Sequence, residues 1–262
     1  EAGMIALIAG CSGVIYLNAI LGQTGPLIAA VVLAYIACAR SRPVVAGIAL
    51  ALALNKPQYA PFLWLTAAFE GRRRALLSAA ISGILGVSLV TALWGVGFWS
   101  EWLSAVRRPN PTLPFMGNWL GAFSRLNLWS DATLQAIAPL IMLGALAGAA
   151  LWLWSSRSLG ADTLGGRARL AGVLALATIA SPNTHPYDLA IWFAQGLLLP
   201  GRKWLTALGA AVFSWAALPF DLRPLFPLLT LGLLIAAFSI AARELRRSSN
   251  VPQELGSVEA GH

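Results

Sequence analysis

The sequence predicts an all-α membrane protein, a polytopic transmembrane bundle of about ten full or broken membrane helices. Hydrophobic residues make up 58% of its 262 positions, and charged residues only 11%. A soluble domain carries about 25% charged residues. Apolar runs recur along most of the chain, with short basic clusters between them. A chain with so few charges cannot cover itself with polar surface, so its expected solvent is lipid.

The expected membrane segments are the apolar runs of the sequence. They fall at roughly 4–21, 24–38, 44–54, 59–69, 75–98, 135–154, 169–181, 187–200, 204–219 and 225–242. Residues 1–248 are therefore expected to form one transmembrane domain. The polar segment 249–262 has no periodicity and is expected to be a disordered cytoplasmic tail. The first residue is Glu1 and no basic segment precedes the first run, so this run is not a signal peptide, and further N-terminal helices are expected to be missing.

The basic residues predict the orientation of the chain in the membrane. Five of the 18 fall in the connections that alternate with the basic segments, and the other thirteen lie in five segments: Arg40 and Arg42; Arg72, Arg73 and Arg74; Arg157, Arg167 and Arg169; Arg202 and Lys203; Arg243, Arg246 and Arg247. Cytoplasmic connections of membrane proteins are rich in Lys and Arg. We therefore expect a multi-pass protein of the bacterial inner membrane with these segments in the cytoplasm. The net charge of +8 is then an orientation signal, so membrane lipids rather than nucleic acid are the expected partners.

Several of these runs are too short to cross a bilayer. A helix of 11 residues rises only about 16 Å, against a hydrocarbon core about 30 Å thick. Runs 44–54 and 59–69 are therefore expected to form a hairpin of short helices, and runs 169–181 and 187–200 a second one. Non-helical backbone at membrane depth must be buried in protein or line a wet cavity. The polar tips of both hairpins are expected to lie below the membrane surface on one face. They therefore predict a cavity that is open to the extracytoplasmic side.

The longest connection, at about 99–134, is expected on the same extracytoplasmic side. It carries four tryptophans among several prolines: Trp99, Trp102, Trp119 and Trp129. Tryptophan is enriched at the headgroup level of membranes. The connection is therefore expected to lie along the membrane surface as short helices.

The first hairpin tip is a candidate phosphate-binding site. Asn55, Lys56 and Gln58 cluster around the helix-breaking Pro57. A lysine between apolar helices is costly and is a functional candidate by default, and its ammonium binds phosphate as a point charge. The alternative is that Lys56 only extends to the interface.

The second tip holds the candidate catalytic residues, His185 and Asp188. His185 is the only histidine besides the C-terminal residue. Imidazole and carboxylate at this depth suit binding of sugar hydroxyls or proton transfer. The alternative for Asp188 is a helix cap.

Three further residues are substrate-binding candidates at the extracytoplasmic face. Gln23 lies between the first two runs, Asn118 stands beside Trp119, and Arg107 suits either a phosphate or lipid headgroups. Asp131 is expected to be a helix N-cap. Cys11 and Cys38 form no CxxC pair or Cys/His cluster, so neither a metal site nor a disulfide is expected.

These stretches, in this order, resemble the polyprenol-phosphate-dependent glycosyltransferases of family 87, in the C-type membrane superfamily. The resemblance rests on Gly22-Gln23, Lys56-Pro57-Gln58 followed by Arg72-Arg73-Arg74, Asn118-Trp119-Leu120-Gly121, and Ser181-Pro182 followed by Tyr187-Asp188-Leu189. It extends from about residue 1 to about 242.

The resemblance implies a hexosyltransferase that moves a sugar, often mannose, from a polyprenyl-phosphate carrier to an extracytoplasmic lipid or glycan acceptor. It implies no cofactor beyond the lipid-linked donor, and a substrate-binding role for Tyr187. Family members carry a catalytic aspartate in an earlier loop, which this chain does not contain before residue 4. The chain is thus expected to be the C-terminal portion of such an enzyme. A multi-pass transporter or lipid flippase, or a non-catalytic membrane subunit, is the alternative.

Overall fold

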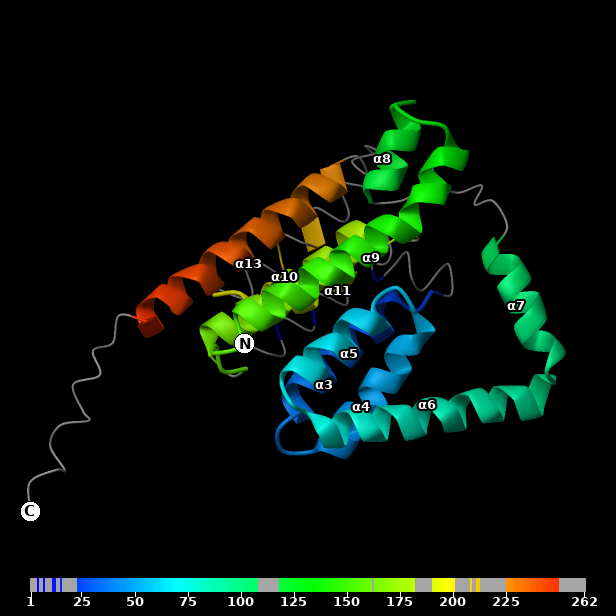
Figure 1. Cartoon of the computed structure of the whole chain (residues 1–262), viewed down its shortest axis with the longest axis horizontal. Helices are drawn as coiled ribbons and strands as arrows, with labels where there is room; N and C mark the ends of the chain where they lie inside the picture. Colours follow the sequence, from blue (N-terminus) through cyan, green and yellow to red (C-terminus); the bar gives the residue numbers. More distant parts are fainter. Residues whose placement is uncertain are drawn as a thin grey trace, which may run out of the picture.

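Helices form all the regular secondary structure of the described residues (Figure 1). The computed structural model describes residues 23–107, 118–161, 163–181, 190–200 and 225–249, with single positions at 4, 7, 11, 12, 15, 208, 211 and 212. The helices are α3 (Gly25–Cys38), α4 (Pro43–Leu52), the 3-10 turn η1 (Ala53–Asn55), α5 (Ala60–Phe69), α6 (Arg73–Trp94), α7 (Gly97–Arg107), α8 (Trp119–Arg125), α9 (Asp131–Ser155), α10 (Leu164–Ala180), α11 (Ile191–Leu198) and α13 (Phe226–Ser249). The predicted all-α class is confirmed. The predicted tail at 249–262 falls outside the described residues apart from Ser249, which ends α13, and the run at 204–219 apart from positions 208, 211 and 212.

The expectation of about ten full or broken membrane helices is not supported. Within the described residues, three helices are long and apolar enough to cross a membrane: Arg73–Trp94, Asp131–Ser155 and Phe226–Arg247. Gly25–Cys38, Pro43–Asn55 and Ala60–Phe69 are shorter apolar helices. An apolar run shows which residues avoid water, but it does not show whether protein or lipid surrounds them.

The first predicted hairpin is confirmed, as α4 with η1 followed by α5. Its helices are 10 residues each, as the length argument requires. The 3-10 turn tightens the end of α4. Pro61 stands in the first turn of α5, where backbone N–H groups have no acceptor within the helix, so the N–H that proline lacks costs no hydrogen bond.

Helix α10 is the buried centre of the bundle and packs against α5, α9, α11 and α13. It begins at Leu164 rather than at the predicted residue 169, because the Thr163 side chain accepts a hydrogen bond from the Gly166 amide at 3.0 Å. Arg169 therefore lies inside the helix, only 3% exposed. The assignment of Arg167 and Arg169 to a loop was wrong.

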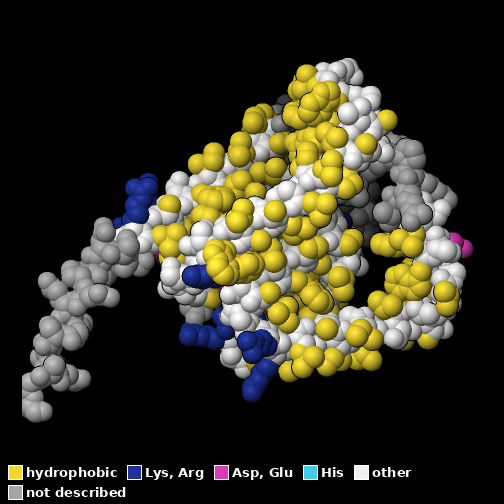
Figure 2. All heavy atoms as spheres, in the orientation of Figure 1, with side chains coloured by type: hydrophobic (Ala, Val, Ile, Leu, Met, Phe, Trp, Pro, Cys, Tyr) yellow, Lys and Arg dark blue, Asp and Glu magenta, His cyan; other side chains and the backbone are white. Residues whose placement is uncertain are grey.

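Helix α6 packs on α4 along one narrow strip and leaves the rest of its apolar surface exposed. A Cβ on Gly47 would lie 2.4 Å from the Ala75 carbonyl oxygen, so the two backbones touch there. Only Ala75 and Ala79 of α6 are buried, whereas Leu77 is 64% exposed. Exposed apolar side chains cover this helix in Figure 2. Such a surface is stable only against lipid or another protein.

The predicted run 75–98 is divided between two helices. Gly95 has a φ of 78°, a left-handed conformation that glycine adopts without a steric penalty. Helix α6 ends at Trp94, and α7 leaves it in a new direction (Figure 1). Helices α7 and α8 confirm that the long connection contains short helices.

The described basic clusters gather at one end of the bundle, as the alternation predicts. Phe69 and Trp154 meet edge to face at 6.4 Å, which brings the end of α5 to the end of α9. A Cβ on Gly165 would lie 3.0 Å from Cβ of Glu244, which places the basic end of α13 there too. Figure 2 shows the Lys and Arg side chains collected at this end. Its assignment to the cytoplasm stays a prediction.

Candidate functional site

The first hairpin tip is a tight turn at the end opposite the basic clusters. The Lys56 amide donates to the Ala53 carbonyl at 3.0 Å, and the Lys56 carbonyl accepts from the Tyr59 amide at 2.9 Å. Asn55 is exposed, Lys56 and Gln58 are half-buried, and Tyr59 is buried. The structure thus presents the three candidate side chains together on a short segment anchored by Tyr59.

An apolar groove runs from this tip along α6. It is lined by residues of α4 and η1 on one side and of α6 and α7 on the other, and its empty space, which is open to the outside, is about 890 Å³. Asn55 lies at its polar end, while Leu52, Leu54 and Val87 line its length. A Cβ on Gly86 would meet nothing within 4 Å, so the glycine leaves the groove open. We call this the α4–α6 groove; Figure 2 shows the hollow between α6, α7 and the rest of the molecule.

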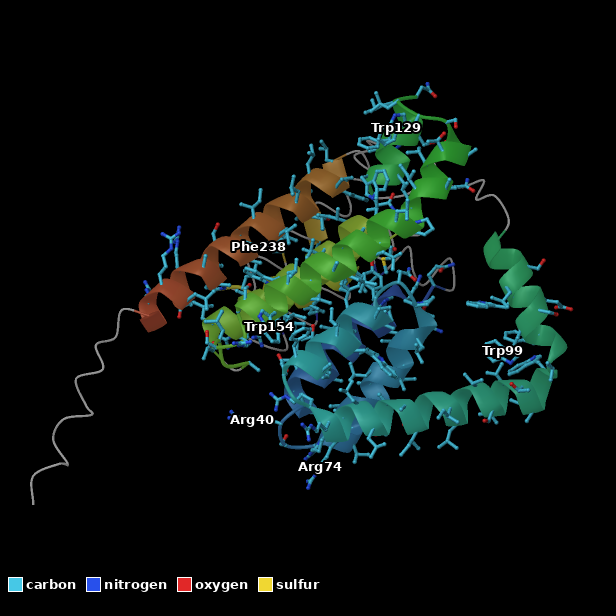
Figure 3. The ribbon with its side chains drawn as sticks, viewed as in Figure 1. Arg40, Arg74, Trp99, Trp129, Trp154 and Phe238 are labelled. Atoms are coloured by element: carbon cyan, nitrogen blue, oxygen red, sulfur yellow. The ribbon has the colours of Figure 1, made fainter. Side chains whose placement is uncertain are left out.

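Trp99 of α7 forms part of the groove wall, near the junction of α6 and α7 (Figure 3). Its indole Nε1 donates to Thr91 Oγ1 at 2.8 Å, and the Thr91 hydroxyl donates to the Val87 carbonyl at 2.8 Å. These bonds fix the α6–α7 corner.

Asn118 joins the long connection to the start of the second tip. Its Nδ2 donates to the Ser181 carbonyl, and its Oδ1 accepts from the Gly121 amide at 3.1 Å. The side chain is 1% exposed. Asn118 therefore caps α8 and holds the end of α10, so two motifs that are 63 residues apart in sequence lie side by side. A substrate-binding role for Asn118 stays a prediction.

Helix α9 starts differently from its sequence-based prediction. Ser130 is the N-cap and accepts from the Thr133 amide at 3.2 Å, while Asp131 is the first helical residue. The prediction of Asp131 as the cap was therefore wrong by one residue. The carboxylate instead accepts from the Ser124 hydroxyl at 2.6 Å and ties α8 to α9.

Gln23 lies at the same end of the bundle as Lys56. It stands two residues before α3, which runs back to the basic end before α4 returns. Gln23 is half-buried. Arg107 is the last residue of α7. The second tip, with His185, Tyr187 and Asp188, lies outside the described residues.

A buried ionic cluster at the basic end escaped the sequence-based reasoning. Arg169 Nη2 lies 3.2 Å from Glu70 Oε1, and Arg72 Nε lies 3.4 Å from Glu70 Oε2. Tyr35 Oη also donates to Glu70, at 3.2 Å, and Arg169 Nη1 donates to the Ser156 and Leu159 carbonyls. The sequence did contain one signal of this cluster, because Glu70 is an acidic residue directly after an apolar run.

Gln195 of α11 is a second polar residue that the sequence-based reasoning missed. It is fully buried, and neither its amide nitrogen nor its amide oxygen has a hydrogen-bond partner among the described residues. A buried amide without partners is costly. Across the described part of the chain, no group of three or more His, Cys, Asp or Glu residues is placed to hold a metal ion.

Comparison with known proteins identifies the family. The sequence profile of glycosyltransferase family 87 matches residues 2–182. No curated protein and no solved structure matches the chain. The match contains the first tip, the long connection and the start of the second tip, but it lies in the N-terminal part of the chain. The resemblance predicted as far as residue 242 is thus supported only to 182. Because the match covers more than half of the 262 residues, the chain belongs to glycosyltransferase family 87 and is a membrane glycosyltransferase.

Proposed function

We propose that this glycosyltransferase takes a mannose-like hexose from a polyprenyl-phosphate carrier and transfers it to a lipid or glycan acceptor on the extracytoplasmic face. The observation that carries the proposal is the α4–α6 groove, which is apolar along its length and ends at Asn55, next to Lys56. A donor with a long apolar tail and a phosphate head has this pattern of polarity. The donor brings its own leaving group, so the reaction requires no cofactor.

The proposed chemistry is an in-line displacement at the anomeric carbon. The acceptor hydroxyl oxygen forms the new bond while the bond from this carbon to the phosphate oxygen breaks, with inversion. The hydroxyl proton passes to a base, and polyprenyl phosphate leaves with the bonding electrons. Lys56 stabilises the charge that develops on the departing phosphate. Asn55, Gln58, Gln23, Asn118, Tyr187 and Arg107 bind substrate, and His185 and Asp188 act at the sugar and the leaving group.

The test supplies the purified full-length protein with one of two radiolabelled donors. One is polyprenyl-phosphate mannose and the other is a nucleotide-activated mannose, each with a bacterial membrane-lipid extract as acceptor. We expect labelled product from the lipid donor only. Label transferred from the nucleotide donor alone would contradict the proposal. Movement of the labelled lipid across a proteoliposome membrane, without a new glycosidic bond, would identify a flippase instead.

Replacement of His185 with alanine is expected to lower turnover about 10- to 1000-fold, because one donor to the transition-state charge is lost. Turnover per folded molecule and the melting temperature are measured on the same purified sample. Thr184→Ala, next to it in the same tip, is the control. A loss of melting temperature with turnover intact would show that His185 is a packing residue only.

A further inference from the structure

Besides the apolar α4–α6 groove, a polar pocket lies at the basic end of the bundle, away from the proposed active site. It is formed by the turn between α3 and α4 and by the start of α6, and its empty space, which is open to the outside, is about 600 Å³. None of its lining residues in the described part of the chain is acidic, and four of them are arginines: Arg40, Arg72, Arg73 and Arg74. We call it the arginine pocket. Figure 3 labels Arg40 and Arg74, which lie at the same end from the two different turns.

The arrangement of α4 and α6 builds this pocket. The close contact at Gly47 and the bond from Ser78 Oγ to the Val44 carbonyl at 3.0 Å hold the two helices together near their first turns. Both helices start at this end, neither has a side-chain cap, and neither carries an acid in its first turn. The arginines of two separate turns are therefore held around one space by tight backbone packing.

The charge around the pocket is mostly positive. Glu70 lies beside it and pairs with Arg72, but the same carboxylate also pairs with Arg169. One negative charge thus faces two arginines, and Arg73 and Arg74 add two exposed positive charges at the start of α6. Guanidinium groups bind phosphate through paired N–H donors.

The surface around the pocket indicates which phosphate it takes. Val44, 59% exposed, and Leu77, 64% exposed, lie two and three residues beyond Arg42 and Arg74. The pocket therefore opens where charged side chains give way to lipid-facing ones. A phospholipid headgroup sits at this boundary with its acyl chains along the apolar surface, whereas a free phosphate makes no use of that surface. Basic pockets between membrane helices bind anionic headgroups in this way.

We propose that the arginine pocket is a binding site for the phosphate of an anionic membrane phospholipid. An orientation signal requires positive charge only, and at any position in the segment. A binding site requires arginines from two turns around one cavity. If the arginines are only an orientation signal, arginines elsewhere at this end should contribute equally to lipid binding. If the pocket is a binding site, only the arginines that line it should contribute strongly.

The experiment titrates the purified full-length protein, in neutral detergent, with phosphatidylglycerol and counts bound lipids by native mass spectrometry. The pocket variant is Arg40→Gln/Arg73→Gln/Arg74→Gln. The matched control removes the same charge from the end of α13, as Arg243→Gln/Arg246→Gln/Arg247→Gln. Each arginine at a membrane surface contributes about a factor of five. We expect about 100-fold weaker binding of one phosphatidylglycerol in the pocket variant, and near-normal binding in the control.

Equal losses in the two triple variants would overturn the site and leave only bulk attraction. Equal binding of phosphatidylcholine, or full displacement of the lipid by inorganic phosphate, would overturn its assignment to an anionic lipid. If the triple variant does not fold, the single variants Arg74→Gln and Arg247→Gln replace the two triples, with an expected loss of about fivefold for Arg74→Gln alone.

Discussion

Replacement of Lys56 with alanine is expected to lower the rate of sugar transfer about 100- to 1000-fold, the effect of removing one preorganised group that stabilises transition-state charge. The side chain lies on the tight turn after η1, next to the polar end of the α4–α6 groove. No other lysine or arginine occurs between Arg42 and Arg72. Initial rates with polyprenyl-phosphate mannose, over a range of donor concentrations, measure the effect.

Two control variants separate this role from a structural one. Lys203, the only other lysine in the chain, is replaced with alanine and should leave the rate unchanged. Lys56→Arg should restore only part of the rate, because a planar guanidinium places its charge differently from an ammonium. A melting temperature close to that of the unaltered protein is expected for Lys56→Ala. An unchanged rate in that variant would refute the phosphate role.

Replacement of Arg169 with alanine is expected to lower the free energy of unfolding by about 3–5 kcal/mol, the cost of removing one partner from a buried ion pair. The Glu70 carboxylate would lose the closer of its two arginines, and the carbonyls of Ser156 and Leu159 would lose their donor. Unfolding of the full-length protein in detergent micelles measures the loss.

The matched control is Arg247→Ala. Arg247 also pairs with a glutamate, at 2.9 Å, but its side chain is 78% exposed. Exposed pairs contribute about 0–1 kcal/mol, so this variant should differ little from the unaltered protein. The double variant Glu70→Leu/Arg169→Met should be more stable than Arg169→Ala, since no charge is left buried without a partner. A small, equal loss in Arg169→Ala and Arg247→Ala would show that the cluster adds no stability.

Local rules explain the parts of the fold that the sequence predicted. The first hairpin followed from run length and from Pro57, which no helix accommodates in its interior. Its observed bounds, Pro43–Leu52 and Ala60–Phe69, lie within one or two residues of the predicted runs. The gathering of basic residues at one end followed from their alternation along the chain. Both signals depend on short stretches of sequence, so one sequence suffices to detect them.

The sequence by itself determined that this is a helical membrane protein. It also determined which apolar segments are too short to cross a bilayer, and which residues stand at the turns between them. Tertiary structure decided which apolar helices are surrounded by protein and which keep an exposed apolar surface. It brought Asn118 to Ser181, Glu70 to Arg169, and the arginines of two turns around one pocket. The physical reason is that hydropathy and helix-breaking residues act over one or two turns. Ion pairs, pockets and grooves depend instead on contacts between helices tens of residues apart, and these contacts leave no periodic trace in either segment.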